Sequence, residues 1–341
     1  MIYFDSDYMA GAHPRVMERI ASTNMEHTIG YGCDEYTRMA ATKIREACYA
    51  PDADVYFLVG GTQTNATVID ALLRRHEGVL AAESGHISVH EAGAVEATGH
   101  KVLTLPHYDG KVKASDVKCY IKEFYNDETY EHMVAPGMLY ISQPTEYGTV
   151  YTLDELTELS SVCHDAGIPL YMDGARLSYA LCSDGCDFTL ADVARLCDVF
   201  YIGGTKAGAM MGEAVVARTG VLKNFFPLVK QHGALLAKGR LLGVQFDELF
   251  TDDLYMEIGR YAVGLAMKIK RAFVERGYEV VVDSPTNQQF FRLPNEVMDA
   301  LKKEASFEVW GTRGETHTVV RFVTSWSTRD EDVDKLIALI K

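Results

Sequence analysis

Chemically reactive residues stand where short apolar runs of this 341-residue chain end. Asp173 directly follows the run at residues 169–172, and Lys206 follows another such run farther along the chain. A third run, at residues 55–59, leads into Gly60-Gly61-Thr62. Because ligands of open parallel sheets gather at the carboxyl ends of the strands, we expect these residues to share one site.

The turn at Gly60-Gly61-Thr62 has the features of an anion site. It opens a helical stretch whose first N–H groups can hold a phosphate, and its glycines let the backbone approach closely. It is neither a Walker loop nor a dinucleotide turn, and a plain turn with a helix cap would also explain it. Together with Asp173 and Lys206, however, this turn indicates a cofactor site. Pyridoxal 5'-phosphate requires a lysine for its aldehyde, a carboxylate for its pyridine nitrogen and a cup for its phosphate.

The elements that must position these residues alternate between strand and helix. Helical apolar spacing recurs at residues 65–75, 115–125 and 153–166, and the last stretch opens with a capping box at Thr152 and Glu155. This alternation is typical of a mostly parallel sheet with crossover helices, so we predict an α/β fold. The seven predicted strands cover residues 55–59, 79–82, 101–105, 138–142, 169–172, 199–202 and 214–217.

The pattern changes after residue 218. Long helical stretches at 221–242 and 252–277 precede short strands and a closing helix at 330–340. We therefore expect a large cofactor-binding α/β domain at residues 51–245 and a small C-terminal α+β domain at residues 246–341. Residues 1–50 are expected to pack on the small domain or on another subunit. The predicted strands of the small domain are residues 279–282, 289–293, 307–310 and 319–324.

Composition narrows the functional class. The chain carries 33 basic and 48 acidic residues, a formal charge of −15. An acidic surface repels nucleic acid and anionic membranes, and no 18-residue apolar window occurs, so we expect a cytoplasmic protein without either partner. The seven scattered cysteines indicate free thiols. His86 and His90 are four residues apart with Glu91 beside them and could bind zinc. No third ligand has matching placement, so we expect no metal.

The segments around these residues resemble the fold-type-I pyridoxal-phosphate-dependent transferases, and among them the threonine aldolases grouped with the β-eliminating lyases. The resemblance runs from about residue 6 to residue 337. Its most specific part is D-G-A-R-L at residues 173–177. The resemblance implies that Asp173 meets the pyridine nitrogen and that Arg176 contacts the ring hydroxyl and the catalytic site. It also implies that Lys206 is the Schiff-base lysine, with Thr205 in place of the usual serine.

Two further matches concern the cofactor. Gly61 and Thr62 resemble the phosphate-binding glycine and threonine of the family. Residues 86–93 resemble its H-x(4)-E-x-G segment, which implies that His86 stacks on the pyridine ring.

Two segments that match the family and one that departs from it concern the substrate. Ser6, in D-S-D, resembles a family serine, and Arg321 resembles the arginine that grips the amino acid's carboxylate, a task suited to a bidentate guanidinium. Where typical members have N-T-H, this chain reads S-Q-P-T-E-Y-G at residues 142–148, and Tyr147 is expected to replace the histidine that contacts the β-hydroxyl. The base that takes the β-hydroxyl proton stays open among His86, Tyr31, Tyr147 and water.

The resemblance implies a pyridoxal-phosphate-dependent lyase that cleaves a β-hydroxy-α-amino acid by retro-aldol chemistry. Threonine, allo-threonine or a bulkier analogue would give glycine and an aldehyde. The alternatives are a β-eliminating lyase or an aminotransferase on the same scaffold, and a non-catalytic protein that keeps the fold. The resemblance also implies a homodimer or homotetramer with shared active sites. In such an oligomer, Lys238 would reach the phosphate bound by the neighbouring subunit, and Lys230 is the alternative residue for this role.

Overall fold

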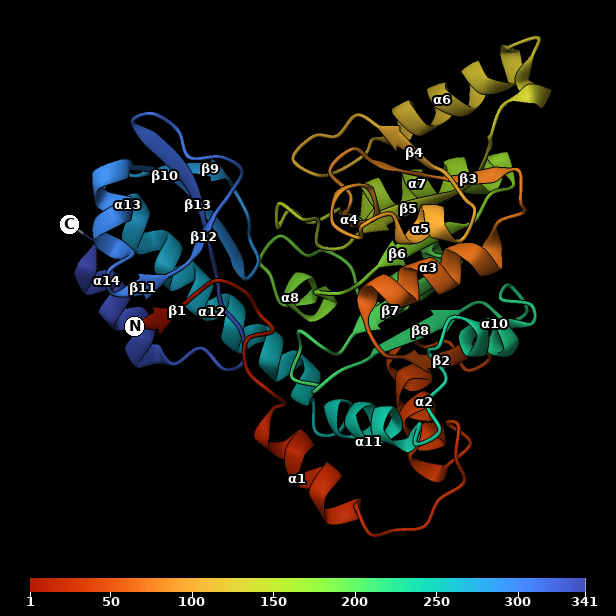
Figure 1. The fold of residues 1–341 in the computed structure, drawn as a ribbon, viewed down its shortest axis with the longest axis horizontal. Helices are drawn as coiled ribbons and strands as arrows, with labels where there is room; N and C mark the ends of the chain where they lie inside the picture. The colour runs from red at the N-terminus through yellow and green to blue at the C-terminus, as the bar shows by residue number, and fades with distance from the viewer. Residues whose placement is uncertain (341) are drawn as a thin grey trace.

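The computed structural model describes residues 1–340, and a seven-stranded sheet lies inside its larger part, on the right in Figure 1. The strands lie in the order β2-β8-β7-β6-β5-β3-β4, and all neighbours are parallel except β8, which is antiparallel to β2 and β7. Each predicted strand is present, which confirms the α/β fold with a mostly parallel sheet. The bounds are β2 Asp54–Leu58, β3 Glu77–Ala82, β4 Val102–Leu105, β5 Ala135–Ser142, β6 Leu170–Asp173, β7 Val199–Gly203 and β8 Glu213–Ala217.

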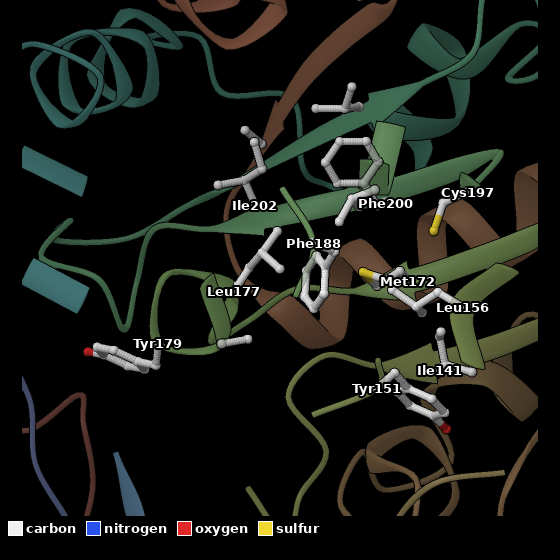
Figure 2. Packing of buried hydrophobic residues seen from close by; sticks show 14 of the residues in the cluster. Ile141, Tyr151, Leu156, Met172, Leu177, Tyr179, Phe188, Cys197, Phe200 and Ile202 are labelled. Carbon is white, nitrogen blue, oxygen red and sulfur yellow. The ribbon is translucent and has the colours of Figure 1, made fainter. Parts of the chain in front are cut away.

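Apolar residues cover both faces of this sheet, because alternate side chains of each strand point to opposite sides. Ile141, Met172 and Phe200 belong to one buried cluster, in which Figure 2 shows Met172 near Leu156 and Phe188. Their neighbours along the strands, among them Tyr201, belong to a second cluster on the other face. The helices that follow the strands are α3 Gly61–Leu72, α4 His86–Val89, α5 Ala94–Ala97, α6 Ala114–Asn126, α7 Leu153–Ala166, α8 Leu177–Leu181, α9 Leu190–Leu196 and α10 Phe225–Gln231, with a 3₁₀ turn at Tyr130–His132.

A second sheet forms the C-terminal part of the molecule. Its four strands are antiparallel and lie in the order β12-β13-β10-β9. The elements are α12 Leu254–Glu275, β9 Glu279–Val282, β10 Gln288–Pro294, α13 Asn295–Leu301, β11 Ala305–Ser306, β12 Glu308–Val309, β13 His317–Val323 and α14 Asp330–Leu339. The long helix α12 joins the two parts, because Ile258 lies in the core of the large sheet and Phe273 in that of the small one.

The N-terminal segment contacts both parts. β1 (Ile2–Tyr3) pairs in parallel with β11 of the C-terminal part. The helices α1 (Pro14–Thr23) and α2 (Glu35–Ala47) pack against α11 (Arg240–Leu249), and the loop between α1 and α2 reaches the bottom of the view in Figure 1. The start of the chain thus runs across the region between the two sheets.

The predicted helix at residues 221–242 is wrong. The structure has two helices there, α10 and α11, separated by an irregular stretch. Gly233 adopts a φ of +72°, a left-handed conformation that terminates α10 and that glycine accepts without strain. No helix within residues 1–340 is long and apolar enough to cross a membrane.

Candidate active site

The carboxyl ends of β5, β6 and β7 surround a cavity of about 330 Å³, which the beginning of α3 and the first residue of β8 also border. Seven of the residues singled out from the sequence line this cavity. They are Gly61, Thr62, His86, Asp173, Arg176, Thr205 and Lys206. The expectation that strand-end residues meet at one edge of the sheet is therefore correct.

Asp173 ends β6 with a carboxylate that is buried and fully hydrogen-bonded. Oδ1 accepts from the Tyr201 hydroxyl (2.5 Å) and the backbone N–H of Ala175 (3.0 Å). Oδ2 accepts from the Tyr140 hydroxyl (2.7 Å) and Nδ2 of Asn65 (3.0 Å). Burial alone would raise the pKa of Asp173, but the charge of His86 and the tyrosine hydrogen bonds lower it below its ordinary value. The site therefore keeps Asp173 ionised.

Lys206 follows β7 in a tight turn, where the N–H groups of Gly204 and Thr205 both donate to the carbonyl of Gly212. Its own carbonyl accepts from the Tyr179 hydroxyl at 2.6 Å, which fixes the backbone. The half-buried side chain faces the cavity, and Nζ makes no hydrogen bond or ion pair within the described residues. Burial and the nearby Arg176 charge lower the pKa of Lys206, which favours the neutral, nucleophilic amine.

His86 begins α4 and lies against the same cavity. Its Nδ1 lies 2.7 Å from Oε1 of the buried Glu91, which also accepts from Nδ2 of Asn65 at 2.7 Å. Burial would lower the pKa of His86, but the Glu91 hydrogen bond and the charge of Asp173 raise it above its ordinary value. The contact with Glu91 fixes the ring's orientation while 36% of the side chain stays accessible.

The N-terminus of α3 points its free N–H groups at the cavity. The helix has 12 residues, no side chain caps it, and the first N–H groups have no partner within the helix. A Cβ added to Gly61 would lie 3.2 Å from the Tyr201 hydroxyl, which is closer than an ordinary van der Waals contact. A glycine at this position avoids that close contact. This uncapped helix start is suited to a phosphate.

Arg176 is held by residues from distant parts of the chain. Its Nε and Nη2 donate to Oδ2 and Oδ1 of Asp7, at 2.6 and 3.1 Å, and Nδ2 of Asn287 donates to Oδ2 at 2.9 Å. The Asp7 side chain is fully buried. The residue next to the predicted Ser6 thus binds Arg176, and Ser6 itself does not line the cavity.

Arg321 and Tyr147 lie together outside the cavity lining. Arg321, on β13, bonds Glu308 and Oε1 of Gln288 (2.8 Å), and its Nε is buried without a hydrogen-bond partner. Its guanidinium carbon lies 4.9 Å from the centre of the Trp310 ring, and Tyr147 packs edge-on against the same ring at 5.7 Å. Tyr147 is therefore part of an aromatic cluster beside Arg321.

Tyr31 and Lys238 lie on the surface and do not line the cavity of their own chain. The backbone N–H of Tyr31 donates to the carbonyl of Ala237 at 3.1 Å, so the two segments lie side by side. Lys230, the competitor of Lys238, places its Nζ 4.7 Å from the centre of the Tyr31 ring. His90 lies with its ring 5.7 Å from that of His86.

Several residues of the site were not found from the sequence. Glu146 and Glu213 line the cavity, and so does Tyr8, whose ring centre lies 6.0 Å from Nζ of Lys206. Two tyrosines near strand ends, Tyr140 and Tyr201, supply hydrogen bonds to Asp173. Both tyrosines stand in strands that lead to the predicted site, which is the one signal that could have indicated them. Aromatic residues in strands are common in protein cores, so this signal does not distinguish the two tyrosines from core residues.

Capture of an aldehyde needs an unpaired amine, and a pyridine nitrogen stays protonated only beside an ionised acid. Lys206 and Asp173 meet these two requirements across one cavity, and the start of α3 meets the need for a phosphate site. This fold and this donor set define the class of pyridoxal-phosphate-dependent enzymes of fold type I.

Comparison with known proteins gives the family. The chain matches the beta-eliminating lyase family over residues 4–267. The solved structure of Leishmania major threonine aldolase is similar over 100% of this chain and 98% of that one, with 42% identity and a TM-score of 0.97. The chain therefore belongs to the beta-eliminating lyase family, in its threonine aldolase group, whose members depend on pyridoxal phosphate.

Two further proteins are similar to this chain, the second in fold alone. A low specificity L-threonine aldolase from a Pseudomonas species is 29% identical over 99% of this chain and 96% of its own length. A variant of Thermus thermophilus aspartate aminotransferase is similar in fold, with a TM-score of 0.74 and 16% identity over 99% of this chain and 90% of that chain.

Proposed function

We propose that this protein is a pyridoxal-phosphate-dependent aldolase that cleaves threonine, or another β-hydroxy-α-amino acid, to glycine and an aldehyde. The observation that carries the proposal is the amine of Lys206, which has no hydrogen-bond or ion-pair partner within the described chain and shares a cavity with ionised Asp173. Similarity to threonine aldolases over nearly the whole chain supports cleavage at Cα–Cβ.

The seven cavity residues singled out from the sequence each have a role in this proposal. Lys206 would hold the cofactor through its aldehyde, and Asp173 would keep the pyridine nitrogen protonated. His86, oriented by Glu91, would cover one face of the ring, and Arg176, fixed by Asp7, would contact the ring hydroxyl. Pyridoxal phosphate, when bound, supplies a conjugated ring that accepts the electron pair of a bond broken at Cα. Gly61 and Thr62 would hold the phosphate with the free N–H groups of α3. Thr205 supports the Lys206 turn, because its hydroxyl accepts from the Gly212 N–H at 3.0 Å.

Arg321 is assigned to the substrate's carboxylate. Its unpartnered Nε is a donor that a carboxylate would satisfy, and its charge interacts with that of Arg176 at the site. Ser6 and Tyr147 are assigned to the substrate as well. Tyr147 and Trp310 form an aromatic wall beside Arg321, which suits a side chain larger than the methyl group of threonine.

We further propose that two copies of the chain share their active sites. Tyr31 and Lys238 would act in the site of the neighbouring copy, since both are exposed and absent from the cavity of their own chain. Exposed Met25 (83%) and Ile29 (69%) border a groove beside Lys238, and a partner would cover these apolar side chains. Pairing of such homodimers would give a homotetramer.

The seven free cysteines fit a reducing, cytoplasmic setting.

Product analysis tests the proposed activity. Purified enzyme loaded with pyridoxal phosphate is incubated with L-threonine, L-allo-threonine and phenylserine, and products are quantified by chromatography. Equal amounts of glycine and the matching aldehyde are expected, and Lys206→Ala should form neither. A keto acid with ammonia would indicate a β-eliminating lyase, and a keto acid with amine transfer would indicate an aminotransferase. No turnover of any substrate would indicate a non-catalytic protein.

A further inference from the structure

Glu146 is an acid at the cavity to which cofactor binding gives no role. It lies in the loop after β5, within the segment at residues 142–148 that departs from the N-T-H of typical threonine aldolases. Its Oε1 accepts from the Ser142 hydroxyl at 2.7 Å and from the backbone N–H of His86 at 2.9 Å. Both bonds fall on one oxygen, and no other residue of the described chain donates to Oε2. The carboxylate is thus anchored by one oxygen and open at the other.

The two other acids of the cavity are already engaged. Asp173 accepts two hydrogen bonds on each oxygen, and its remaining role is assigned to the pyridine nitrogen. Glu213 accepts from the backbone N–H of Gly204 at 3.0 Å and from the Thr205 hydroxyl, and so supports the turn that carries Lys206. Glu146, in contrast, is held through Oε1 by Ser142 and the His86 backbone and supports neither the pyridine nitrogen nor the turn that carries Lys206.

The three side chains considered from the sequence as bases are placed less well than Glu146. Tyr147 packs in the aromatic cluster and does not line the cavity, and Tyr31 is exposed and could act only in the site of a neighbouring copy. His86 does line the cavity, but its Nδ1 is engaged with Oε1 of Glu91, and its ring is already assigned to the face of the cofactor. A base must be unprotonated and must reach the β-hydroxyl.

We propose that Glu146 is the catalytic base that takes the β-hydroxyl proton of the substrate, an inference that rests on the proposed aldolase function. The O–H bond breaks and its proton passes to Oε2 of Glu146. The electron pair left on oxygen becomes the second bond of the aldehyde carbonyl while Cα–Cβ breaks. The pair from Cα–Cβ enters the electron sink described above, and the proton returned at Cα completes glycine. Atoms balance, since one β-hydroxy amino acid gives one glycine and one aldehyde.

The surroundings of Glu146 suit this task. Burial raises the pKa of Glu146 above its ordinary value, which brings its affinity for a proton closer to what a base needs near neutral pH. The other titratable groups that face it are Asp173, His86, Tyr140 and Tyr151. Asp173 raises the pKa of Glu146 and His86 lowers it, so the two charges act in opposite directions. Cleavage should therefore weaken as the pH falls through the raised pKa, because the carboxylate becomes protonated.

Glu146→Gln tests the inference, because glutamine keeps Oε1 as an acceptor for Ser142 and His86 and replaces Oε2 by a group that cannot take a proton. We expect kcat for L-threonine cleavage to fall about 10²-fold or more. The Kd of glycine, which has no β-hydroxyl, should stay within about twofold by calorimetry, because that binding does not use Oε2. The acidic fall of kcat in the wild type should disappear in the variant. Glu83→Gln is the control, because Glu83 is an exposed acid just after β3 that does not line the cavity, and kcat should stay at the wild-type value.

Each outcome decides the matter. A lower kcat with normal glycine binding supports Glu146 as the base. Unchanged kcat in Glu146→Gln overturns the inference and leaves the aldolase function intact. Loss of glycine binding together with cleavage would assign Glu146 a structural role and would also overturn it. A wild-type enzyme that releases no glycine from any β-hydroxy amino acid contradicts the aldolase function, and the inference falls with it.

Discussion

Asp7→Asn should destabilise the protein strongly, although Asp7 lies near the start of the chain. Asp7 makes two hydrogen bonds to Arg176 and accepts one from Asn287, so one carboxylate joins the N-terminal segment, the large sheet and the C-terminal part. The side chain of Asp7 is 0% exposed and that of Arg176 is 13% exposed. Replacement by asparagine would leave the Arg176 charge nearly buried without its counter-charge.

The magnitude follows from this burial. Removal of one partner of a buried ion pair costs about 3–5 kcal/mol. Because part of Arg176 still reaches solvent, we expect about 3 kcal/mol. Burial alone would raise the pKa of Asp7, but Arg176 and Lys206 lower it below its ordinary value of 3.8. The stabilisation is therefore fully present above pH 3.8 and is lost as the pH falls through the lower pKa of the folded state.

Urea unfolding of the cofactor-free protein measures this effect, with fluorescence of the two tryptophans, Trp310 and Trp326, as the signal. At neutral pH the free energy of unfolding should fall by about 3 kcal/mol in Asp7→Asn. Asp165→Asn makes the same change at an exposed acid and should alter it by less than about 0.5 kcal/mol. Equal stability of Asp7→Asn and the wild type would refute the argument that this ion pair joins the three segments.

Three further predictions concern activity and assembly. Asp173→Asn should lower kcat about 10²-fold or more at saturating cofactor, because a neutral amide cannot hold the pyridine nitrogen protonated; normal kcat would exclude this role. Arg321→Lys should raise KM for threonine at least about 30-fold, since loss of a bidentate pair costs about 2–5 kcal/mol; an unchanged KM would place the carboxylate elsewhere. Lys238→Ala should weaken cofactor affinity and the dimer together in titration and sedimentation, whereas Lys223→Ala should change neither; a Lys238 variant with normal affinity and assembly would contradict the contact between subunits.

The sequence predicts the sheet and the cofactor residues well for a physical reason. Buried strands need continuous apolar runs, so each strand is visible locally, and the fold places the residue after each run at one edge. Asp173 and Lys206 were therefore predicted together, and the structure places both at one cavity. Gly233 shows where local patterns fail, because apolar spacing on either side of it suggested one continuous helix.

Hydrogen bonds between residues far apart in the sequence could not be predicted from the sequence. Asp7 and Asn287 are 280 positions apart, and nothing local in either segment indicates their hydrogen bond. Ser6 was named from a motif, yet its neighbour Asp7 makes the bonds to Arg176. Glu146 was passed over for Tyr147 in the same way, since only the backbone path after β5 decides which of two adjacent side chains lines the cavity.

The central claim of this account is that the amine of Lys206 is where pyridoxal phosphate attaches. Borohydride reduction of the loaded enzyme, followed by proteolysis and mass spectrometry, locates the attachment directly. We predict one stable pyridoxyl label, on the peptide that contains Lys206, and no label in Lys206→Ala. A label on another lysine of the wild type, or an equal label in the Lys206→Ala variant, would contradict the account.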